Sequence, residues 1–220
     1  MTARRLGGLT LTTLLVASAA PLAAQEAGIP APAAQTAAVT AAAAPLRLAL
    51  QPESRLWFRG GSTVRDFECQ ATTLDGAFAI DLATSQVDVA ALGNAVADVA
   101  LDIPVARIDC GNGTMNDHMR KALNAEERPM IHFRYDGHEV SPNLDGTASV
   151  RINGRLTING EERAVTLDAT AVAEDGETLR VVGSYELDMT EYGVKPPRLM
   201  LGTLKVHDNV TVHFDLVLKP

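Results

Sequence analysis

The sequence predicts a mainly β, antiparallel fold with one short helix inserted. Apolar and polar residues alternate with a period of two in eight segments, which is the pattern of half-buried strands. Asn-Gly and Asp-Gly pairs recur along the chain, and a helical spacing occurs in one segment. Because no long crossover segments are present, we expect consecutive strands to pair antiparallel, in either a sandwich or a closed barrel.

The first 24 residues have the order of a secretory signal peptide. Arg4 and Arg5 precede an uncharged apolar run at 9–20, and small residues follow before Gln25. This order predicts export and cleavage after Ala24. A membrane anchor is the alternative, but the run is shorter than the roughly 20 apolar residues that a membrane span needs.

Residues 25–45 differ in composition from the rest of the chain. They are mostly alanine with three prolines and almost no charge, and no periodic large apolar face is present. This composition predicts a flexible linker, with a helix as the alternative. We therefore expect one folded domain at 46–220.

The chain is acidic and has the composition of a globular protein. It carries 19 Lys and Arg residues against 27 Asp and Glu residues, and 46% of it is hydrophobic. Nucleic-acid binding depends on a basic stripe, and no dense cluster of Lys and Arg occurs. We therefore expect a buried core and no nucleic-acid partner.

The eight expected strands follow one another through the domain. They centre on 56–58, 67–71, 78–82, 97–103, 131–135, 150–158, 179–189 and 210–218. Pairs of residues that favour turns occur between them, since Asn-Gly and Asp-Gly tolerate positive φ angles. These pairs are Gly60-Gly61, Asp75-Gly76, Asp136-Gly137, Asp145-Gly146, Asn159-Gly160 and Asp175-Gly176.

One short amphipathic helix is expected at 114–124. Its apolar residues recur at i, i+4, i+7 and i+8, which are Met115, Met119, Ala122 and Leu123. We expect Thr114 to cap the first turn, and Pro129 lies beyond the end. The sequence leaves open whether this helix packs on the sheet or gates an entrance.

Four motifs follow one another in the expected domain: STVRDF at 62–67, MNDHM at 115–119 continuing to PMIHF at 129–133, VRINGRLTING at 150–160, and YGV at 192–194. Their order and spacing resemble the YceI family over nearly the whole domain, with a patchier resemblance at 82–108. The resemblance implies an antiparallel eight-stranded lipocalin-like barrel. It also implies a periplasmic or secreted protein that binds polyisoprenoid lipids in the barrel lumen.

The inward-facing positions of such a barrel are uncharged. We expect an apolar lumen formed by Phe58, Phe67, Ile131, Phe133, Val150, Ile152, Leu156, Leu179, Val181, Tyr185, Leu187, Val212 and Phe214. The small residues Gly154, Ala169 and Gly183 lie among them and leave room for a chain-like guest. The alternative is that these side chains simply pack on one another.

The expected function is therefore an exported, soluble lipid-binding protein that acts as a carrier or a store. Its partners are a long-chain apolar lipid, such as a polyisoprenoid or an isoprenoid quinone-like molecule, a membrane touched transiently, and as a further candidate a second copy of the chain. No cofactor is expected. A packed structural or interaction module without ligand, and an enzyme acting on an apolar substrate at the barrel mouth, are the alternatives.

Two cysteines are present, Cys69 on an expected strand and Cys110 before the helix. Exported proteins with an even number of cysteines are usually oxidised, so we expect a disulfide that ties the helix-bearing loop to the barrel. Two free thiols or a metal site are the alternatives.

The sequence offers no motif for catalysis or metal binding. It contains neither Gly-x-Ser-x-Gly nor a phosphate loop, and it lacks His-Glu-x-x-His. We therefore expect no enzyme activity and no metal site. The histidines are expected on the solvated surface, with His118 also a candidate for a polar mouth; they are His118, His132, His138, His207 and His213.

Overall fold

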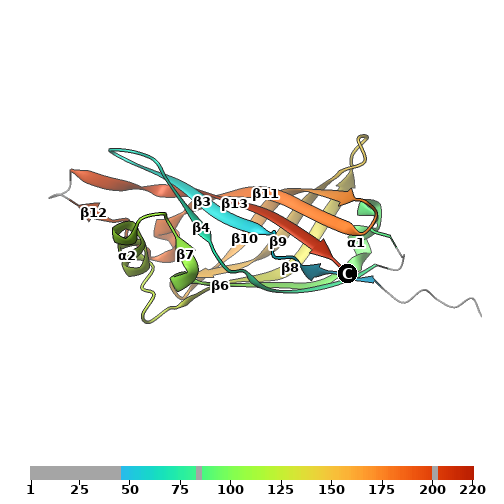
Figure 1. The fold of residues 1–220 in the computed structure, drawn as a ribbon, viewed down its shortest axis with the longest axis horizontal. Coiled ribbons are helices and arrows are strands. Elements are labelled where there is room, and N and C mark those ends of the chain that lie inside the picture. Colours follow the sequence, from blue (N-terminus) through green and yellow to red (C-terminus); the bar gives the residue numbers. More distant parts are fainter. Residues whose placement is uncertain (1–45, 83–85, 200–202) are drawn as a thin grey trace, which may run out of the picture. The chain divides into compact units, whose positions relative to one another are not determined.

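The structure is a computed structural model that describes residues 46–82, 86–199 and 203–220. The expected signal peptide and linker lie outside the described residues. The described part is mainly one antiparallel sheet that curls around a central axis, with short helices at its two ends (Figure 1). None of the described helices has both the length and the apolar character needed to span a membrane.

The sheet contains thirteen strands within the described residues. They are β1 Leu46–Arg47, β2 Ala49–Leu50, β3 Arg55–Ser62, β4 Phe67–Ala71, β5 Asp75–Leu82, β6 Val96–Pro104, β7 Ile108–Asp109, β8 Met130–Pro142, β9 Ala148–Ile158, β10 Glu161–Glu174, β11 Thr178–Asp188, β12 Arg198–Leu199 and β13 Leu204–Lys219. The helices are α1 Leu92–Ala95 and α2 Gly113–Ala122, with the 3-10 turns η1 Val89–Ala91, η2 Val105–Arg107 and η3 Met189–Tyr192.

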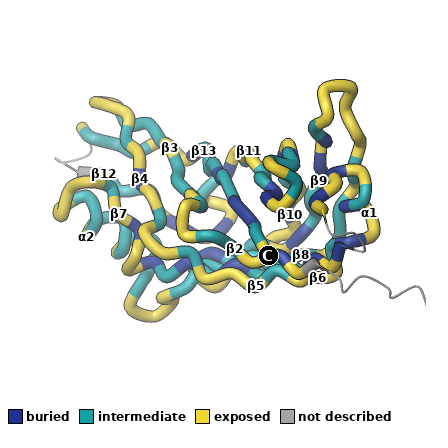
Figure 2. Tube along the Cα trace, turned by 45° about the vertical axis from the view of Figure 1, so that its right-hand side comes forward, coloured by how far each residue is buried: buried dark blue, intermediate teal, exposed yellow. Residues whose placement is uncertain are grey.

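The strands form a continuous antiparallel path in the order β1-β5-β6-β8-β9-β10-β11-β13-β3-β4-β7. The two ends of the path, β1 and β7, do not pair with each other, so the sheet is an open barrel. At one end of the barrel β1 pairs with β5 while β2 pairs with β13. The N-terminal segment that contains β1 and β2 therefore connects β5 to β13 there. Buried residues alternate with more exposed ones along parts of β5 and β9 (Figure 2), as half-buried strands require.

The expectation of eight strands is wrong. The longest strand that the sequence pattern missed is β10, which lies between β9 and β11. Its inward positions include Ala169 and Ala171, whose small side chains weaken the period-two signal. The strands β1, β2, β7 and β12 have two residues each, too few to show a period.

Three of the six expected turns are confirmed. Asp145-Gly146, Asn159-Gly160 and Asp175-Gly176 join consecutive strands, and Asn159 and Gly160 have φ angles of 53° and 83°. The pair at Asn159 thus supplies the two positive φ angles that a tight hairpin turn needs.

The other three expected turns are wrong, because these residue pairs lie within strands. Gly60-Gly61 lies in β3, Asp75-Gly76 in β5, and Asp136-Gly137 in β8, where the pairing with β9 shifts register. An added methyl group would lie 2.5 Å from the Phe67 ring at Gly60 and 2.6 Å from the Phe78 ring at Gly76. These two glycines therefore admit an aromatic ring against the backbone rather than a turn.

The expected helix is confirmed as α2, but its cap is not Thr114. The side chain of Asn112 accepts a hydrogen bond from the Met115 amide at 3.1 Å and so caps the helix. Asn116 then fastens this helix to the preceding loop. Its Oδ1 accepts from the Cys110 amide at 2.7 Å, and its Nδ2 donates to Asp109 at 2.8 Å.

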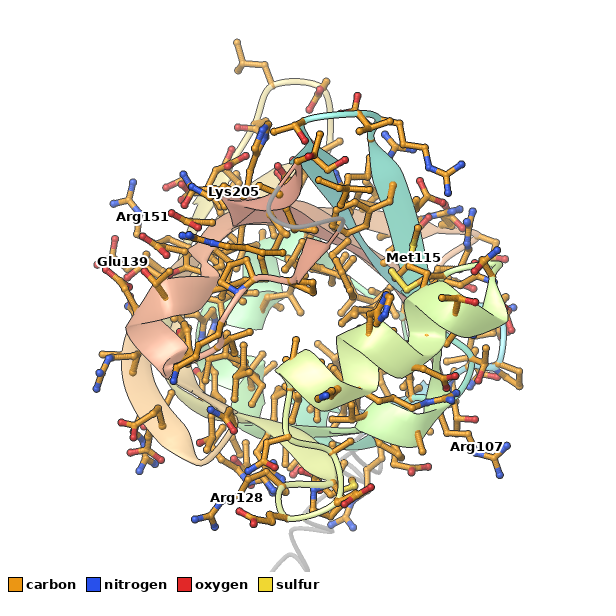
Figure 3. All side chains as sticks on the ribbon, turned by 90° about the vertical axis from the view of Figure 1, so that its left-hand side faces the viewer. Arg107, Met115, Arg128, Glu139, Arg151 and Lys205 are labelled. Atoms are coloured by element: carbon orange, nitrogen blue, oxygen red, sulfur yellow. A yellow bond between two sulfur atoms is a disulfide. The ribbon has the colours of Figure 1, made fainter. Side chains whose placement is uncertain are left out.

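The two ends of the barrel differ in packing. At the α1 end, residues of η1 and α1 join inward residues of five strands in a buried apolar cluster that includes Leu82, Leu92 and Leu179. At the opposite end, α2 lies across the barrel opening (Figure 3) and contains no buried residue. The barrel is therefore closed by side chains at the α1 end and loosely covered at the α2 end.

Candidate functional site

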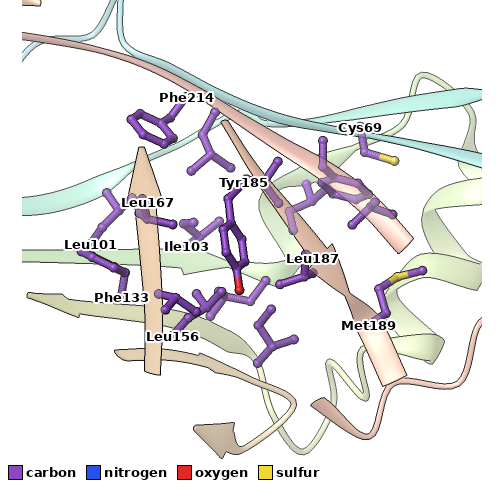
Figure 4. A pocket seen from close by; sticks show the side chains of 18 of the residues that line it. Cys69, Leu101, Ile103, Phe133, Leu156, Leu167, Tyr185, Leu187, Met189 and Phe214 are labelled. Atoms are coloured by element: carbon purple, nitrogen blue, oxygen red, sulfur yellow. The ribbon is translucent and has the colours of Figure 1, made fainter. Parts of the chain in front are cut away.

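The curled sheet encloses an apolar cavity of about 450 Å³ (Figure 4). This volume is within the range of about 300–1,000 Å³ that is usual for ligand sites. Its walls are side chains of alternate residues on the long strands, together with one side of α2. A chain-like apolar guest therefore has both space and an apolar environment inside the barrel.

All thirteen residues that the sequence analysis assigned to the lumen line this cavity: Phe58, Phe67, Ile131, Phe133, Val150, Ile152, Leu156, Leu179, Val181, Tyr185, Leu187, Val212 and Phe214. They come from β3, β4, β8, β9, β11 and β13. Their role in ligand binding stays a prediction.

Sequence reasoning missed further parts of the wall. The inward side chains of β5 and β6 include Phe78, Leu101 and Ile103, and β10 contributes Val165 and Leu167. The period of β5 and β6 was visible in the sequence, and extending the same inward phase to them would have found these residues.

The expectation that the small residues of the lumen leave room for a guest is wrong. A methyl group added at Gly154 would lie 2.6 Å from the Phe133 ring, and one at Gly183 would collide with Phe214. The space at these glycines is thus occupied by aromatic rings rather than left to a guest. By accepting the rings against the backbone, the glycines keep them close to the wall. Ala169 is buried and is not part of the cavity lining.

Cys69 on β4 and Cys110 before α2 form the expected disulfide. Both residues line the cavity, and Cys69 is 1% exposed. The bond fastens the start of α2 to the barrel wall, whereas the other end of the helix continues into the loop that leads to β8.

A polar rim marks the opening of the cavity at the α2 end. Its residues come from the end of β3, the β3–β4 loop, the cap of α2 and α2 itself, and they are Ser62, Arg65, Asn112, Thr114 and His118. Arg65, Asn112 and Thr114 are exposed. Lining residues that also reach solvent show that the cavity opens here.

A second polar group lies deeper in the cavity, toward α1. Tyr135 donates a hydrogen bond to Nδ1 of His138 at 2.5 Å, and Nε2 of His138 donates to the Leu92 carbonyl at 3.0 Å. This chain of bonds satisfies the imidazole on both sides. It also attaches α1 to β8.

The expected surface location is therefore wrong for His138, which lines the cavity, whereas His118 lies in the polar rim, as expected of a candidate for a polar mouth. His132 lies outside the cavity and contacts Asp102 at 2.6 Å, while His213 stacks on Trp57. Among the described residues no group of three or more His, Cys, Asp or Glu side chains is arranged to hold a metal ion.

Two further tyrosines lie in the cavity wall. Tyr185 projects into the cavity from β11 (Figure 4), and Tyr192 follows at the end of η3. Burial raises the pKa of Tyr192 to about 12, and Tyr185 and Glu191 add to the rise. Burial also raises the pKa of Tyr185. Both phenols therefore stay neutral near pH 7.

The sequence matches the family model described as a YceI-like domain over residues 50–218. No match is found among curated proteins.

Solved structures share the fold at low sequence identity. BcnA of Burkholderia cenocepacia is 20% identical, with a TM-score of 0.61, over 77% of this chain and 99% of its own. A polyisoprenoid binding domain from Saccharophagus degradans is 13% identical, with a TM-score of 0.58, over 79% and 98%. The YceI protein of Campylobacter jejuni is 14% identical, with a TM-score of 0.53, over 69% and 84%.

Proposed function

Because the chain belongs to the YceI-like domain family, we propose that it binds a polyisoprenoid or a similar long apolar lipid inside its barrel. The observation that carries this proposal is the apolar cavity of about 450 Å³, which opens to solvent through a polar rim. The fold shared with a polyisoprenoid binding domain of Saccharophagus degradans supports the same ligand class.

The energetics favour a carrier over an irreversible store. Moving one five-carbon isoprene unit out of water is worth about 4 kcal/mol, at about 0.8 kcal/mol per methylene-sized group. A tail inside a membrane has already gained this free energy. Transfer from bilayer to barrel is then close to balance once the tail is ordered, so the lipid can be both loaded and released.

Entry at the α2 end agrees with the packing of that helix. Met115 and Met119 line the cavity with flexible side chains that adapt to irregular apolar surfaces. The helix has no buried residue, and the disulfide fastens the loop before it. We infer that α2 moves about this attachment to admit the ligand.

We further propose that the chain is exported to the periplasm, with residues 1–24 as its signal peptide. The disulfide between Cys69 and Cys110 supports an oxidising compartment. A carrier of this kind would contact membranes transiently.

The cavity argues against the alternative of a packed module, since a solidly filled barrel would leave no such space. The enzyme alternative requires an ionisable group inside the barrel, and Tyr185 is the candidate from the sequence. A Tyr185→Phe variant that leaves the chemistry of the bound lipid unchanged would remove Tyr185 as the catalytic candidate.

Native mass spectrometry with solvent extraction tests the proposal on protein taken directly from its own periplasm. We expect a reproducible hydrophobic mass that leaves on extraction and returns when an isoprenoid lipid is added back. Protein that carries no such mass, and that takes up none after extraction, would contradict lipid binding.

A further inference from the structure

Tyr192 has a buried hydroxyl group without a hydrogen-bond partner in the described part of the chain. The residue is 1% exposed and lines the cavity. Most buried polar groups in proteins bond to the protein or to ordered water, because an unpaired one costs free energy. The position of this hydroxyl therefore indicates a partner that these residues do not supply.

Local structure holds Tyr192 in place. The carboxylate of Asp188 caps η3 by accepting from the Thr190 amide at 2.8 Å, and Gly193 ends the turn with a φ of 66°. The carbonyl of Tyr192 accepts from the side chain of Asn159 at 3.2 Å. With its backbone fastened on both sides, the ring has little freedom to turn its hydroxyl toward another protein group.

Tyr185 provides a second hydroxyl in the same part of the cavity. It packs against the buried cluster that contains Tyr192, and its ring stands in the cavity (Figure 4). Both tyrosines line the same cavity, and Tyr185 is among the causes of the raised pKa of Tyr192. No described residue bonds to the Tyr185 hydroxyl. Two groups that can each donate a proton thus occupy one apolar space.

The surrounding charges disfavour an anion at this place. Glu191 raises the pKa of both tyrosines, so its negative charge acts on the site. Arg163 lowers the pKa of Tyr192, but its effect is the smallest of the four causes, and its side chain is exposed. Among the described lining residues the permanent positive charge is on Arg65, at the exposed rim.

An uncharged acceptor fits these properties better than a donor. A neutral phenol donates a hydrogen bond more strongly than it accepts one, because its oxygen lone pair is delocalised into the ring. A carbonyl oxygen can accept from two donors at once, since it has two lone pairs.

We propose that Tyr192 and Tyr185 form a subsite inside the lumen that donates hydrogen bonds to an uncharged carbonyl oxygen of the bound lipid, as in a ketone, quinone, ester or amide. The inference rests on the proposed function, because the lipid chain must occupy the rest of the lumen. It adds that the polar group of the ligand is held inside the barrel and not only at the rim.

Two probes with one carbon skeleton test this subsite. Geranylgeranylacetone is an isoprenoid ketone, and its matched hydrocarbon has a methylene in place of the carbonyl. Binding of each to the delipidated protein is measured by titration calorimetry. In Tyr192→Phe we expect about a tenfold loss of affinity for the ketone and a change of less than about twofold for the hydrocarbon. Without ligand the variant should melt no lower than the parent protein, since it loses only an unpaired hydroxyl.

Tyr135→Phe is the matched control. It removes a hydroxyl from the same cavity, but one that already bonds to His138. We expect this variant to change the affinity for both probes by the same factor.

Each other outcome decides the matter. If Tyr192→Phe loses the same affinity for the ketone as for the hydrocarbon, the subsite is overturned. It is also overturned if the variant loses affinity for neither probe, and this result would mean that water alone satisfies the hydroxyl. The choice of an uncharged acceptor would be overturned if geranylgeranyl phosphate binds the parent protein more tightly than the ketone does and loses this affinity in Tyr192→Phe. If the parent protein binds neither probe, the proposed function fails first. If Tyr192→Phe does not fold, Tyr185→Phe gives the same comparison.

Discussion

The ring of Phe133 on β8 lies against Gly154 on the neighbouring strand β9, where a methyl group would come within 2.6 Å of two ring carbons. The same methyl group would lie 2.6 Å from the carbonyl oxygen of Arg134. The glycine therefore makes room for an aromatic wall residue of the cavity.

Gly154→Ala should displace this ring into the lumen. Because the backbone carbonyl of Arg134 cannot yield easily, we expect a loss of about 1–3 kcal/mol in the free energy of unfolding, typical of an overpacked core. Lipid occupancy should fall as well. Denaturant titration and native mass spectrometry measure the two effects. Gly137→Ala is the control, since nothing lies within 4 Å of a methyl group there. Unchanged occupancy in a folded Gly154→Ala would show that the ring moves elsewhere.

Phe133→Asp should empty the cavity of lipid. The substitution places a carboxylate among apolar lining residues, where neither a bound tail nor the protein can solvate it. We expect protein that folds with lower stability and carries no extractable lipid. Circular dichroism establishes the fold, and mass spectrometry the occupancy. If the variant carries lipid at the level of the parent protein, the inward assignment of β8 as a ligand-binding wall is wrong.

The inward wall was predictable because its signal is local. A period of two in large apolar residues requires no knowledge of the neighbouring strands, and it placed residues such as Phe133 and Leu187 on the cavity wall. The same rule failed at β10, where Ala169 and Ala171 give too little contrast with the outward positions. That Asn112 rather than Thr114 caps α2 was not predictable either, because both residue types favour the cap position and local preference alone does not choose between them.

Features that depend on contacts between distant segments were not predictable. Gly60 resembles a turn residue until Phe67 on the next strand is seen against it. His138 reaches the lumen because the register shift between Tyr135 and Gly137 places it opposite Ile152, which lines the cavity. The unpaired hydroxyl of Tyr192 has no sequence signal, since only the packing of η3 against the barrel buries it.

Loss of the disulfide should destabilise the domain. A closed loop of 41 residues is worth about 4 kcal/mol in the loop-entropy model. Replacing both Cys69 and Cys110 by Ala should lower the free energy of unfolding by about this amount. Addition of a reductant should have a similar effect on the parent protein and none on the variant. Denaturant titration measures both.

Thiol titration of the unfolded, unreduced protein provides the direct check of the bond. We expect no reactive thiol from Cys69 or Cys110. Two thiols per chain would show that the disulfide does not form in the cell.

Acid should loosen the attachment of α2. The pKa of Asp109 is lowered, first by the hydrogen bond from the side chain of Asn116 and next by that from the Gly111 amide. A carboxylate whose pKa is lower in the folded state favours folding above its unfolded pKa, which is about 3.9. This contribution is lost as the pH falls from there through the lower, folded-state value. The link from Asp109 to α2 should therefore weaken in that window.

Methyl NMR signals of Met115 and Met119 report on this change, since both residues lie on α2 and line the cavity. We expect the signals to shift or broaden in the acid window while the signals of the strands stay in place. In Asp109→Asn, which cannot ionise at this position, the methionine signals should lose that pH dependence. Asp145→Asn is the control, because hydrogen bonds from Thr147 lower the pKa of Asp145 in the same way at the distant β8–β9 turn. An identical acid response in Asp109→Asn and the parent protein would mean that the bond to Asn116 does not hold α2, and that the helix is attached through the disulfide loop alone.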